Sequence, residues 1–571
     1  MSTEALPASC DLLVVGSGAA GLAAAISAAH AGLRPVVIEK AEYFGGSTAV
    51  SGGAIWVPDN PIMRAAGMED DPKAARRYIE LETGNRFNAE LVDAFLENGP
   101  KAIGFFNEKT ALKMTHRPYA PDYHPDEEGA ALGGRVLDAL EYDGKALGKD
   151  LTRLRPPIRE FTILGGMQLG RMDLYHFVRM TRQWPSFVHA TKQVLRYFKD
   201  KVMVGRNTRL SLGAAVAARL AETVFALKIP LLTEHELISL ERDASGRVTA
   251  AVVGTKQGER TVTVTNGVVL AGGGFPHDTK RRAETFDHVR RGLPHYSMSP
   301  SASTGGAISA AEAIGAAFVD TNSDAASWAP ISLIPQPDGS HRPFPHLFMD
   351  RAKPGIIAVG HDGRRFTNEA ASYHDFVQGL IAKLLDEGRK SAFLICDHSA
   401  LRRYGLGAVP CFPGRIGPYL KSGYLKRGSN AADLGAVCGI DVGTLEATIN
   451  RFNQFAAQGT DPDFGKGSTA YQTALGDPDH KPNQCLKPLE GTLYAIEIYP
   501  GDIGTTMGLS VTGSGQVRDR DGNVIDGLFA CGNDMNSIMA GSYPGAGITL
   551  GPALTFGYVV GKTAAAKAAA A

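Results

Sequence analysis

A glycine-rich turn near the start of the chain limits the fold more than any other feature. Residues 11–40 contain DLLVV, GSGAAG, LAAAISAAHAG and RPVVIEK in that order, which predicts a strand, a turn, a helix and a second strand. Gly16 permits the tight turn, Gly18 lets the backbone approach a pyrophosphate, and Gly21 lets the helix pack closely. The helix N-terminus then faces the phosphates, so the pattern predicts a dinucleotide-binding βαβ unit.

The acidic residue that such a unit needs follows at the end of the second strand. Glu39 is placed to accept hydrogen bonds from an adenosine ribose, and Lys40 stands beside it. Ala19 and Ala20, inside the glycine turn, complete the predicted cofactor contacts of this region. The alternative is an ordinary glycine turn without a ligand, and the strand, helix and acidic residue around the turn argue against it.

Further strand-like segments lie far from this unit. TVTVTNGVVLAGGGF ends at residue 275 and contains Gly272 and Gly273, and GLFACGN lies near the C-terminus. A chain of 571 residues is long enough for two domains. We therefore predict an α/β fold in which a Rossmann-like domain, residues 1–297 and 490–571, carries an inserted α+β catalytic domain, residues 298–489.

Charge and cysteine content exclude several classes of protein. Lys+Arg and Asp+Glu both number 59, which disfavours nucleic acid as a partner. The six cysteines are scattered without a CxxC pair, so we expect neither a disulfide framework nor a metal site. The N-terminus lacks the basic region of a signal peptide, and we expect no transmembrane helix. These features favour a cytoplasmic location.

Residues 151–210 differ from the rest of the chain. Twelve Lys and Arg face three Asp and Glu there, a net charge of +9. Apolar residues recur at helical spacing between Leu174 and Phe198, and Pro185 should divide the segment into two helices. A basic amphipathic stretch can lie on a membrane surface, here the inner face of the cell membrane, or its apolar stripe can pack on its own domain. The sequence leaves both interpretations open.

The string GGSTAVSGGA at residues 45–54 resembles the flavin loop of the fumarate reductase and succinate dehydrogenase flavoprotein superfamily. Small residues there let the backbone pass close to a cofactor and offer N–H donors. The resemblance implies FAD as cofactor. Members with covalent FAD carry a histidine in this loop, whereas this chain has serine and threonine, so we expect non-covalent FAD. The implied contacts are Gly46, Ser47, Thr48, Ser51, Gly52, Gly53 and Ala54.

The C-terminal region resembles the same superfamily. Gly532 and Asn533 match its flavin contacts, as does the GITLG run that contains Leu550. A helix that begins in this run would direct its positive end at the flavin O2 and N1, where it would stabilise the reduced ring.

Three motifs resemble the 3-ketosteroid Δ1-dehydrogenases of that superfamily. PDY ends at Tyr123, NEAASY ends at Tyr373, and YPGAG runs from Tyr543 to Gly547. The resemblance covers the chain outside 151–210, and that basic segment favours the cholest-4-en-3-one type. By this resemblance, Tyr543 and the Gly547 amide polarise the C3 carbonyl, and Tyr373, assisted by Tyr123, removes the C2 proton. Hydride then passes from C1 to flavin N5.

The implied substrate is a 3-ketosteroid such as androst-4-ene-3,17-dione or cholest-4-en-3-one, and the electron acceptor is unknown. A Δ4-(5α)-dehydrogenase is an alternative, although those enzymes lack the first tyrosine. A fumarate reductase-like ene reductase is another, although threonines replace its substrate histidine in GTTMGL, residues 504–509. A flavin electron carrier without steroid chemistry is the third. We expect most histidines to be structural, with His124 and His374 as candidate pocket residues beside the tyrosines.

Overall fold

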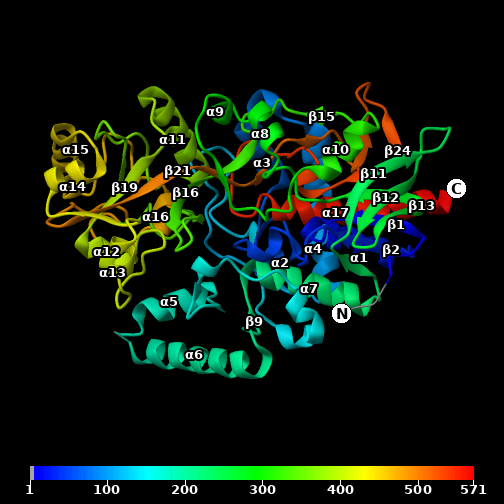
Figure 1. Cartoon of the computed structure of the whole chain (residues 1–571), viewed down its shortest axis with the longest axis horizontal. Coiled ribbons are helices and arrows are strands. Elements are labelled where there is room, and N and C mark those ends of the chain that lie inside the picture. The colour runs from blue at the N-terminus through cyan, green and yellow to red at the C-terminus, as the bar shows by residue number, and fades with distance from the viewer. Residues whose placement is uncertain (1–4, 182, 571) are drawn as a thin grey trace.

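The computed structural model describes residues 5–181 and 183–570, and two sheets organise the chain (Figure 1). Two sequence predictions involve residues outside this part of the chain. Arg182 was counted in the basic segment, and the first four residues belong to the N-terminus that was expected to lack a signal peptide. Within the described residues, no helix has the length and apolarity needed to span a bilayer. All six cysteines are free thiols.

The first sheet has a parallel centre in which β1 pairs with both β2 and β13. Its path is β10-β2-β1-β13-β12-β11, and β24 pairs with β13 and with β23. Leu12, Leu13 and Val14 of β1 are fully buried, which explains their continuous apolar run, because a central parallel strand is covered on both faces. The strands are β1 (Ser9–Val15), β2 (Pro35–Glu39), β10 (Leu231–Thr233), β11 (Glu236–Arg242), β12 (Val248–Thr255), β13 (Gly258–Leu270), β23 (Gln516–Arg518) and β24 (Val524–Ala530).

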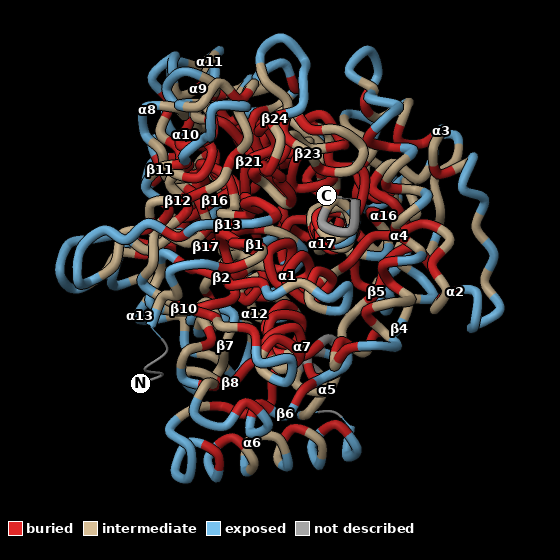
Figure 2. Tube along the Cα trace, turned by 90° about the vertical axis from the view of Figure 1, so that its right-hand side faces the viewer, coloured by how far each residue is buried: buried red, intermediate tan, exposed pale blue. Residues whose placement is uncertain are grey.

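The last helix of the chain returns to the first. α17 (Leu550–Ala570) packs on α1 (Ala19–His30), with α4 (Ala89–Lys109) and α7 (Leu212–Ala226) nearby. A Cβ at Gly557 would lie 2.5 Å from the Ala20 carbonyl oxygen, and one at Gly561 equally close to that of Ala24. Glycine and alanine therefore let the two helices approach closely, and Figure 2 shows both buried. Both ends of the chain build this domain, and the predicted Rossmann-like architecture is confirmed.

The second sheet lies in the other half of the molecule and is mostly antiparallel. Its path is β17-β16-β21-β19-β18, with β14 and β20 paired to β21. The strands are β14 (Tyr296–Ser297), β16 (Ala326–Pro335), β17 (His341–Pro345), β18 (Ile356–Val359), β19 (Ala392–Asp397), β20 (Lys426–Gly428) and β21 (Leu493–Thr505). β14 and β21 lie just outside residues 298–489, and the division into domains at those residues stays a prediction.

Helices surround this second sheet. They are α11 (Tyr373–Glu387), α12 (His398–Tyr404), α13 (Gly417–Lys421), α14 (Ala431–Cys438), α15 (Val442–Ala456) and α16 (Ala470–Leu475). α14 and α15 contribute to a separate apolar cluster with β18 and β19. α11 packs on β16, which places the first residue of α11 near the first domain.

Shorter elements connect the two halves. They are α2 (Pro61–Ala65), α3 (Pro72–Thr83), α8 (Thr279–Thr285), α9 (Asp287–Arg290), α10 (Gly306–Ala313), β3 (Ala54–Trp56), β4 (Met114–His116), β5 (Val136–Ala139), β6 (Tyr142–Asp143), β9 (Arg209–Leu210), β15 (Phe318–Val319) and β22 (Gly508–Leu509).

The basic segment forms a projection at one end of the molecule (Figure 1). It contains β7 (Thr162–Ile163), β8 (Met167–Gln168), α5 (Arg171–Arg179) and α6 (Trp184–Val204). Pro185 lies in the first turn of α6, so the predicted division into two helices is confirmed. α6 buries Ala190 and Tyr197 on one side, but it exposes Leu195 and Phe198.

Candidate active site

The three tyrosines singled out in the sequence lie together at the boundary between the two sheets. Their side chains are buried, with at most 4% exposed. The Tyr123 hydroxyl donates to the Tyr373 hydroxyl at 3.3 Å. The ring of Tyr543 lies 5.1 Å from that of Tyr373 and 5.7 Å from that of Tyr123, centroid to centroid. Three residues up to 420 positions apart in sequence thus form one cluster.

Local backbone structure fixes each of these tyrosines. The Tyr123 N–H donates to the Pro544 carbonyl at 2.8 Å, which joins the first tyrosine's loop to the YPGAG segment. Tyr78 of α3 donates to the same carbonyl, also at 2.8 Å. Tyr373 is the first residue of α11, and Ser372 caps that helix by accepting the Asp375 N–H. The third tyrosine motif therefore anchors the first.

A buried ionic network holds the residue before Tyr123. Asp122 accepts from Trp56 Nε1 and from Arg135 Nη1, each at 2.8 Å. Arg135 also forms a two-point ion pair with Asp70, at 2.8 and 2.9 Å. The side chains of Arg135, Asp70 and Asp122 are at most 7% exposed, so the paired charges satisfy one another where water cannot. The network fixes the Tyr123 loop rigidly to the first domain.

Burial changes the acidity of the cluster. Removal from water raises the pKa of Tyr123 and Tyr373 well above the ordinary value, and it raises that of Tyr543 as well. The three phenols are therefore neutral at neutral pH. A neutral Tyr543 can donate a hydrogen bond to a ketone oxygen. Tyr373 can act as a base only after it loses its own proton, and the hydrogen bond that the Tyr123 hydroxyl donates to it favours that phenolate.

A fourth tyrosine, Tyr471 on α16, belongs to the cluster and was not singled out in the sequence. Its ring lies 4.5 Å from that of Tyr123, and its buried hydroxyl has no hydrogen-bond partner among the described residues. Burial raises its pKa, and the charge of Arg351, itself buried, opposes that rise. No recognisable motif surrounds Tyr471 in the sequence, so its place in the cluster is seen only in the folded structure.

Gly547 occupies a position that only glycine fits. Its φ is +96°, and a Cβ there would lie 2.6 Å from the Ala54 carbonyl. Its own carbonyl accepts the Trp56 N–H at 3.1 Å. Gly547 is therefore packed directly on β3, four residues after Tyr543, and its role as a ketone clamp stays a prediction.

The N-terminal glycine turn has the shape expected of a dinucleotide cradle. A Cβ at Gly16, φ +106°, would lie 2.1 Å from the Ala271 carbonyl oxygen, and one at Gly21 would lie 2.0 Å from the Gly16 oxygen. At Gly18, the N-cap of α1, the nearest atom to a Cβ is the Thr48 hydroxyl at 3.7 Å. The turn is thus tight on its protein side and open above the helix N-terminus, where a pyrophosphate binds.

Glu39 and Lys40 differ in their surroundings. Glu39 Oε2 accepts from the Ser17 N–H and hydroxyl at 3.1 and 2.5 Å, and Oε1 accepts from Ala41 N–H. A carboxylate accepts about four hydrogen bonds, so one position stays available for a ribose hydroxyl. Lys40 Nζ instead lies 2.8 Å from Glu236 and donates to Thr304, and its predicted cofactor contact is not tested.

The loop at residues 45–54 lies against the glycine turn. Thr48 accepts the Ala19 N–H at 3.0 Å, and a Cβ at Gly46 would lie 3.5 Å from Gly18 Cα. Ser51 accepts the Gly53 N–H at 3.1 Å, and a Cβ on Gly53 would meet backbone at 2.4 Å. The other predicted loop contacts are Ser47, the N-cap of a short 3-10 helix at residues 48–50, Gly52, which has open space beside it, and Ala54, the first residue of β3.

Asp534 organises the C-terminal side of the cradle. It accepts the N–H groups of Gly272 and Gly274 at 2.5 and 2.8 Å, and burial raises its pKa to about 6. Gly273, φ +89°, lies between those glycines. Gly532, φ +64°, sits where a Cβ would be 2.9 Å from that of Ala20.

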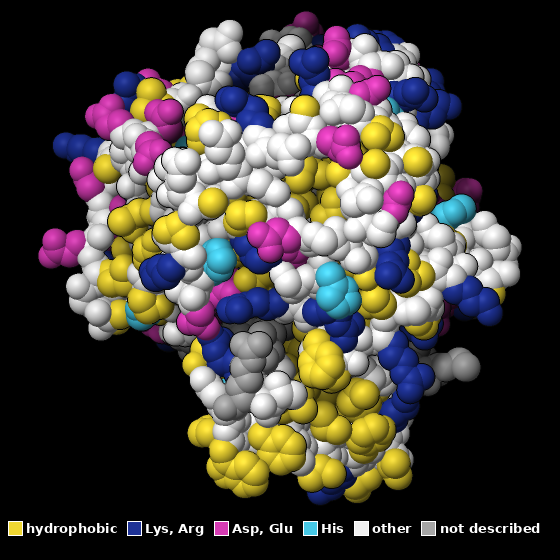
Figure 3. All heavy atoms as spheres, turned by 90° about the vertical axis from the view of Figure 1, so that its left-hand side faces the viewer, with side chains coloured by type: hydrophobic (Ala, Val, Ile, Leu, Met, Phe, Trp, Pro, Cys, Tyr) yellow, Lys and Arg dark blue, Asp and Glu magenta, His cyan; other side chains and the backbone are white. Residues whose placement is uncertain are grey.

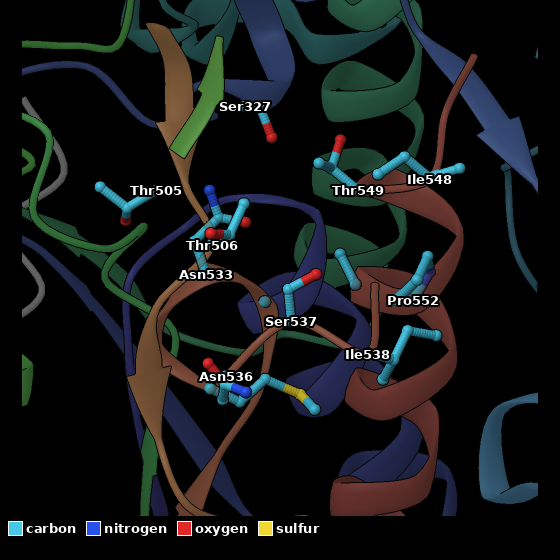
Figure 4. Close-up of a pocket in the computed structure, with 13 residues that line it drawn as sticks. Ser327, Thr505, Thr506, Asn533, Asn536, Ser537, Ile538, Ile548, Thr549 and Pro552 are labelled. Carbon is cyan, nitrogen blue, oxygen red and sulfur yellow. The ribbon is translucent and has the colours of Figure 1, made fainter. Parts of the chain in front are cut away.

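A pocket opens between this region and the start of α17 (Figure 4). Small and hydroxylated residues line it, among them Ser327, Thr506, Asn533, Ser537 and Thr549. The buried Ser327 hydroxyl has no partner among the described residues, as expected of a group that meets a ligand. The helix N-terminus and these donors fit the isoalloxazine of FAD, and Leu550 begins the helix there.

The two histidines beside the tyrosines have different roles. His374 is buried, and its Nδ1 accepts the Trp328 N–H at 3.1 Å while Nε2 lies 3.3 Å from Asp324. Its ring also lies 6.1 Å from that of Tyr543, centroid to centroid. His124 lies between two carboxylates, those of Glu82 and Asp375.

Comparison with known proteins agrees with this site. Residues 11–550 match the family described as FAD binding domain. The chain is 38% identical to 4-oxocyclohex-2-ene-1-carboxylate 5-dehydrogenase of Sinomonas cyclohexanicum, over 98% of this chain and 94% of that protein. It is 34% identical to 3-oxosteroid 1-dehydrogenase of Mycolicibacterium smegmatis, over 98% of each chain.

A solved structure extends the similarity to three dimensions. The 3-ketosteroid Δ1-dehydrogenase of Sterolibacterium denitrificans, in complex with 1,4-androstadiene-3,17-dione, superimposes with a TM-score of 0.90 at 31% identity. The match covers 98% of this chain and all of that one. The resemblance that the tyrosine motifs indicated is confirmed, and FAD is the cofactor. The chain belongs to the FAD-binding domain family, among the 3-oxosteroid 1-dehydrogenases and their relatives.

Proposed function

We propose that this protein is an FAD-dependent dehydrogenase that converts a 3-keto-4-ene steroid to the 1,4-diene. The observation that carries the proposal is the buried cluster of Tyr123, Tyr373 and Tyr543, in which the first two hydroxyls are 3.3 Å apart. Relatives at 31–34% identity are named as dehydrogenases of 3-oxosteroids or 3-ketosteroids, and these names support this substrate class.

In this reaction the residues divide the work. Tyr543 and the Gly547 N–H bind the C3 oxygen and stabilise the charge that develops on it, which makes the neighbouring C2–H acidic. Tyr373 acts from its phenolate form, reached by prior loss of its own proton to solvent. The Tyr123 hydroxyl donates to that oxygen and stabilises the phenolate, which then accepts the C2 proton and becomes the neutral phenol. The chemistry that bound FAD supplies is acceptance of the C1 hydride at N5. The buried site keeps water away from the enolate.

A smaller cyclic ketone is the second candidate substrate. The relative at 38% identity is named for dehydrogenation of 4-oxocyclohex-2-ene-1-carboxylate. Like a 3-ketosteroid, this molecule has a ring ketone, and its dehydrogenation also removes a proton from a carbon next to that ketone. The tyrosine clamp and base serve either molecule, since both reactions begin at the ketone. The two proposed substrates therefore differ only in the part of the molecule beyond the ring that carries the ketone.

Anaerobic flavin reduction tests both substrates. Purified holoenzyme would be mixed separately with androst-4-ene-3,17-dione, cholest-4-en-3-one and 4-oxocyclohex-2-ene-1-carboxylate, and the oxidised flavin band followed. We expect the steroids to bleach the band and to lose two hydrogens, with the new double bond at C1–C2. If a 5α-reduced 3-ketosteroid is offered as a separate substrate, a new double bond at C4–C5 would indicate Δ4 chemistry. If only 4-oxocyclohex-2-ene-1-carboxylate bleached the flavin, the smaller cyclic ketone would be the substrate and the steroid proposal would be wrong.

We also propose that α5 and α6 attach the protein to an anionic membrane surface. α6 exposes Trp184, Leu195 and Val202 by 74, 66 and 86%. Figure 3 shows hydrophobic side chains gathered at this end of the molecule, with Lys and Arg beside them. Lys192 and Lys199 on the same helix are exposed. An apolar stripe with flanking cations fits a headgroup boundary, and a surface that holds sterols would then supply the substrate.

Vesicle sedimentation tests this attachment. The variant Trp184→Gln/Leu195→Gln removes two of the exposed apolar side chains of α6, whereas Phe412→Gln removes an apolar side chain elsewhere in the molecule that is 63% exposed. We expect the first variant to stay in the supernatant with phosphatidylglycerol vesicles while the control and the parent sediment. Equal sedimentation of all three, or none by the parent, would contradict the attachment.

A further inference from the structure

His124 links the loop that carries Tyr123 to the helix that begins at Tyr373. Its Nδ1 lies 2.6 Å from Glu82 Oε1, at the end of α3, and its Nε2 lies 2.9 Å from Asp375 Oδ2, in the first turn of α11. His124 directly follows Tyr123, and Asp375 is two residues after Tyr373. One imidazole therefore joins the backbone beside each tyrosine.

Both ring nitrogens face a carboxylate, so both must donate, and only the imidazolium has two N–H groups. Burial alone would lower the His124 pKa, but hydrogen bonds to Asp375 and Glu82, together with their charges, raise it to about 10. Without that proton two carboxylates would face each other across a neutral ring. The arrangement is a closed three-member ionic cluster at neutral pH.

The groups around this cluster complete it. Tyr78, also on α3, accepts the His124 backbone N–H at 3.3 Å and donates to the carbonyl that receives the Tyr123 N–H. The Glu82 side chain is 6% exposed and that of Asp375 31% exposed. α3 belongs to the first half of the chain, and α11 packs on β16 of the second sheet, so the cluster joins these two parts of the molecule.

We propose that His124 is a positioning residue, an ionic latch that holds Tyr123 at hydrogen-bond distance from Tyr373. The inference rests on the proposed function, since the tyrosine pair is its proton-accepting unit. The 3.3 Å separation of the hydroxyls is already at the long end of hydrogen bonding, so a small movement of α11 relative to the Tyr123 loop breaks the contact. The latch acts through that distance and does not touch the substrate.

The test compares His124→Gln, Asp375→Asn and the double variant, all as holoenzymes. His341→Gln, an exposed histidine on β17, is the matched control. We expect each single variant to reduce the limiting rate of flavin reduction at least tenfold, with KM nearly unchanged and the flavin spectrum intact. The double variant should be no slower than the slower single variant, because one latch is lost in each case.

The pH profile supplies a readout that general loss of structure does not move. In the parent, the rate should fall as pH rises through about 10, where His124 loses its proton, and this limb should be absent in His124→Gln. A parent that reduces its flavin with none of the ketones overturns the proposed function instead. With an active parent, unchanged rates in both single variants overturn the latch, as does loss of FAD or of the fold in both.

Discussion

Replacing Tyr373 by Phe removes one oxygen from the centre of the site and leaves the ring in place. The ring contacts Tyr123, Tyr543 and Phe348 at centroid distances of 5.7, 5.1 and 5.7 Å, and a phenyl group keeps all three. The lost hydroxyl contact contributes about 1 kcal/mol to stability, a small part of the total for a protein of this size. The fold and the FAD site should therefore be unchanged.

The catalytic effect should be much larger. A positioned base contributes about 10²–10⁴-fold to a rate, or about 3–5 kcal/mol of barrier, and Tyr373 is the phenol that accepts the Tyr123 hydrogen bond. The assay is the first-order rate of flavin bleaching at saturating ketone without oxygen. The control is Tyr404→Phe, which loses a hydrogen bond to Asp477 of 2.7 Å outside the cluster. A Tyr373→Phe rate within tenfold of the control would refute the assignment of the base.

Three further outcomes can be measured on single variants or by pH. Gly547→Ala should lose flavin reduction, because its Cβ would lie 2.6 Å from β3 backbone at a positive φ. Arg135→Met should lower the free energy of unfolding by about 3–5 kcal/mol in denaturant titration, since it leaves Asp70 and Asp122 buried and unpaired. His124 has a folded pKa above its unfolded value, so its stabilisation is present below about pH 6.5 and is lost as pH rises through about 10. Discounted for partial exposure, that loss should be about 1–3 kcal/mol, measured by comparing the parent with His124→Gln at pH 7 and 10.5.

Features set by neighbouring residues could be predicted from the sequence. Gly16 and Gly21 lie where a Cβ would meet backbone at about 2 Å, as the turn requires. Pro185 begins a helix, because proline fits the first turn and not the interior. The three tyrosines were found through motifs, and the structure brings them together.

Features that depend on distant parts of the chain could not be predicted. Tyr471 has no motif around it, although it lies 4.5 Å from Tyr123. The ion-pair partner of Lys40, Glu236, comes from β11, almost 200 positions later in the chain. The apolar spacing of α6 was visible, yet only the structure shows that Leu195 and Phe198 face outward.

The proposed site draws its residues from both halves of the molecule. Tyr123, Tyr543 and Gly547 lie on segments tied to one another and to β3, whereas Tyr373 begins α11, which packs on β16 of the second sheet. By the proposed roles, ketone polarisation belongs to the first half, and proton removal depends on its contact with the second. Changes at that boundary should slow the reaction before they release FAD. Variants of boundary residues such as His124 should therefore retain FAD and react slowly, whereas variants of the cradle residues should lose FAD.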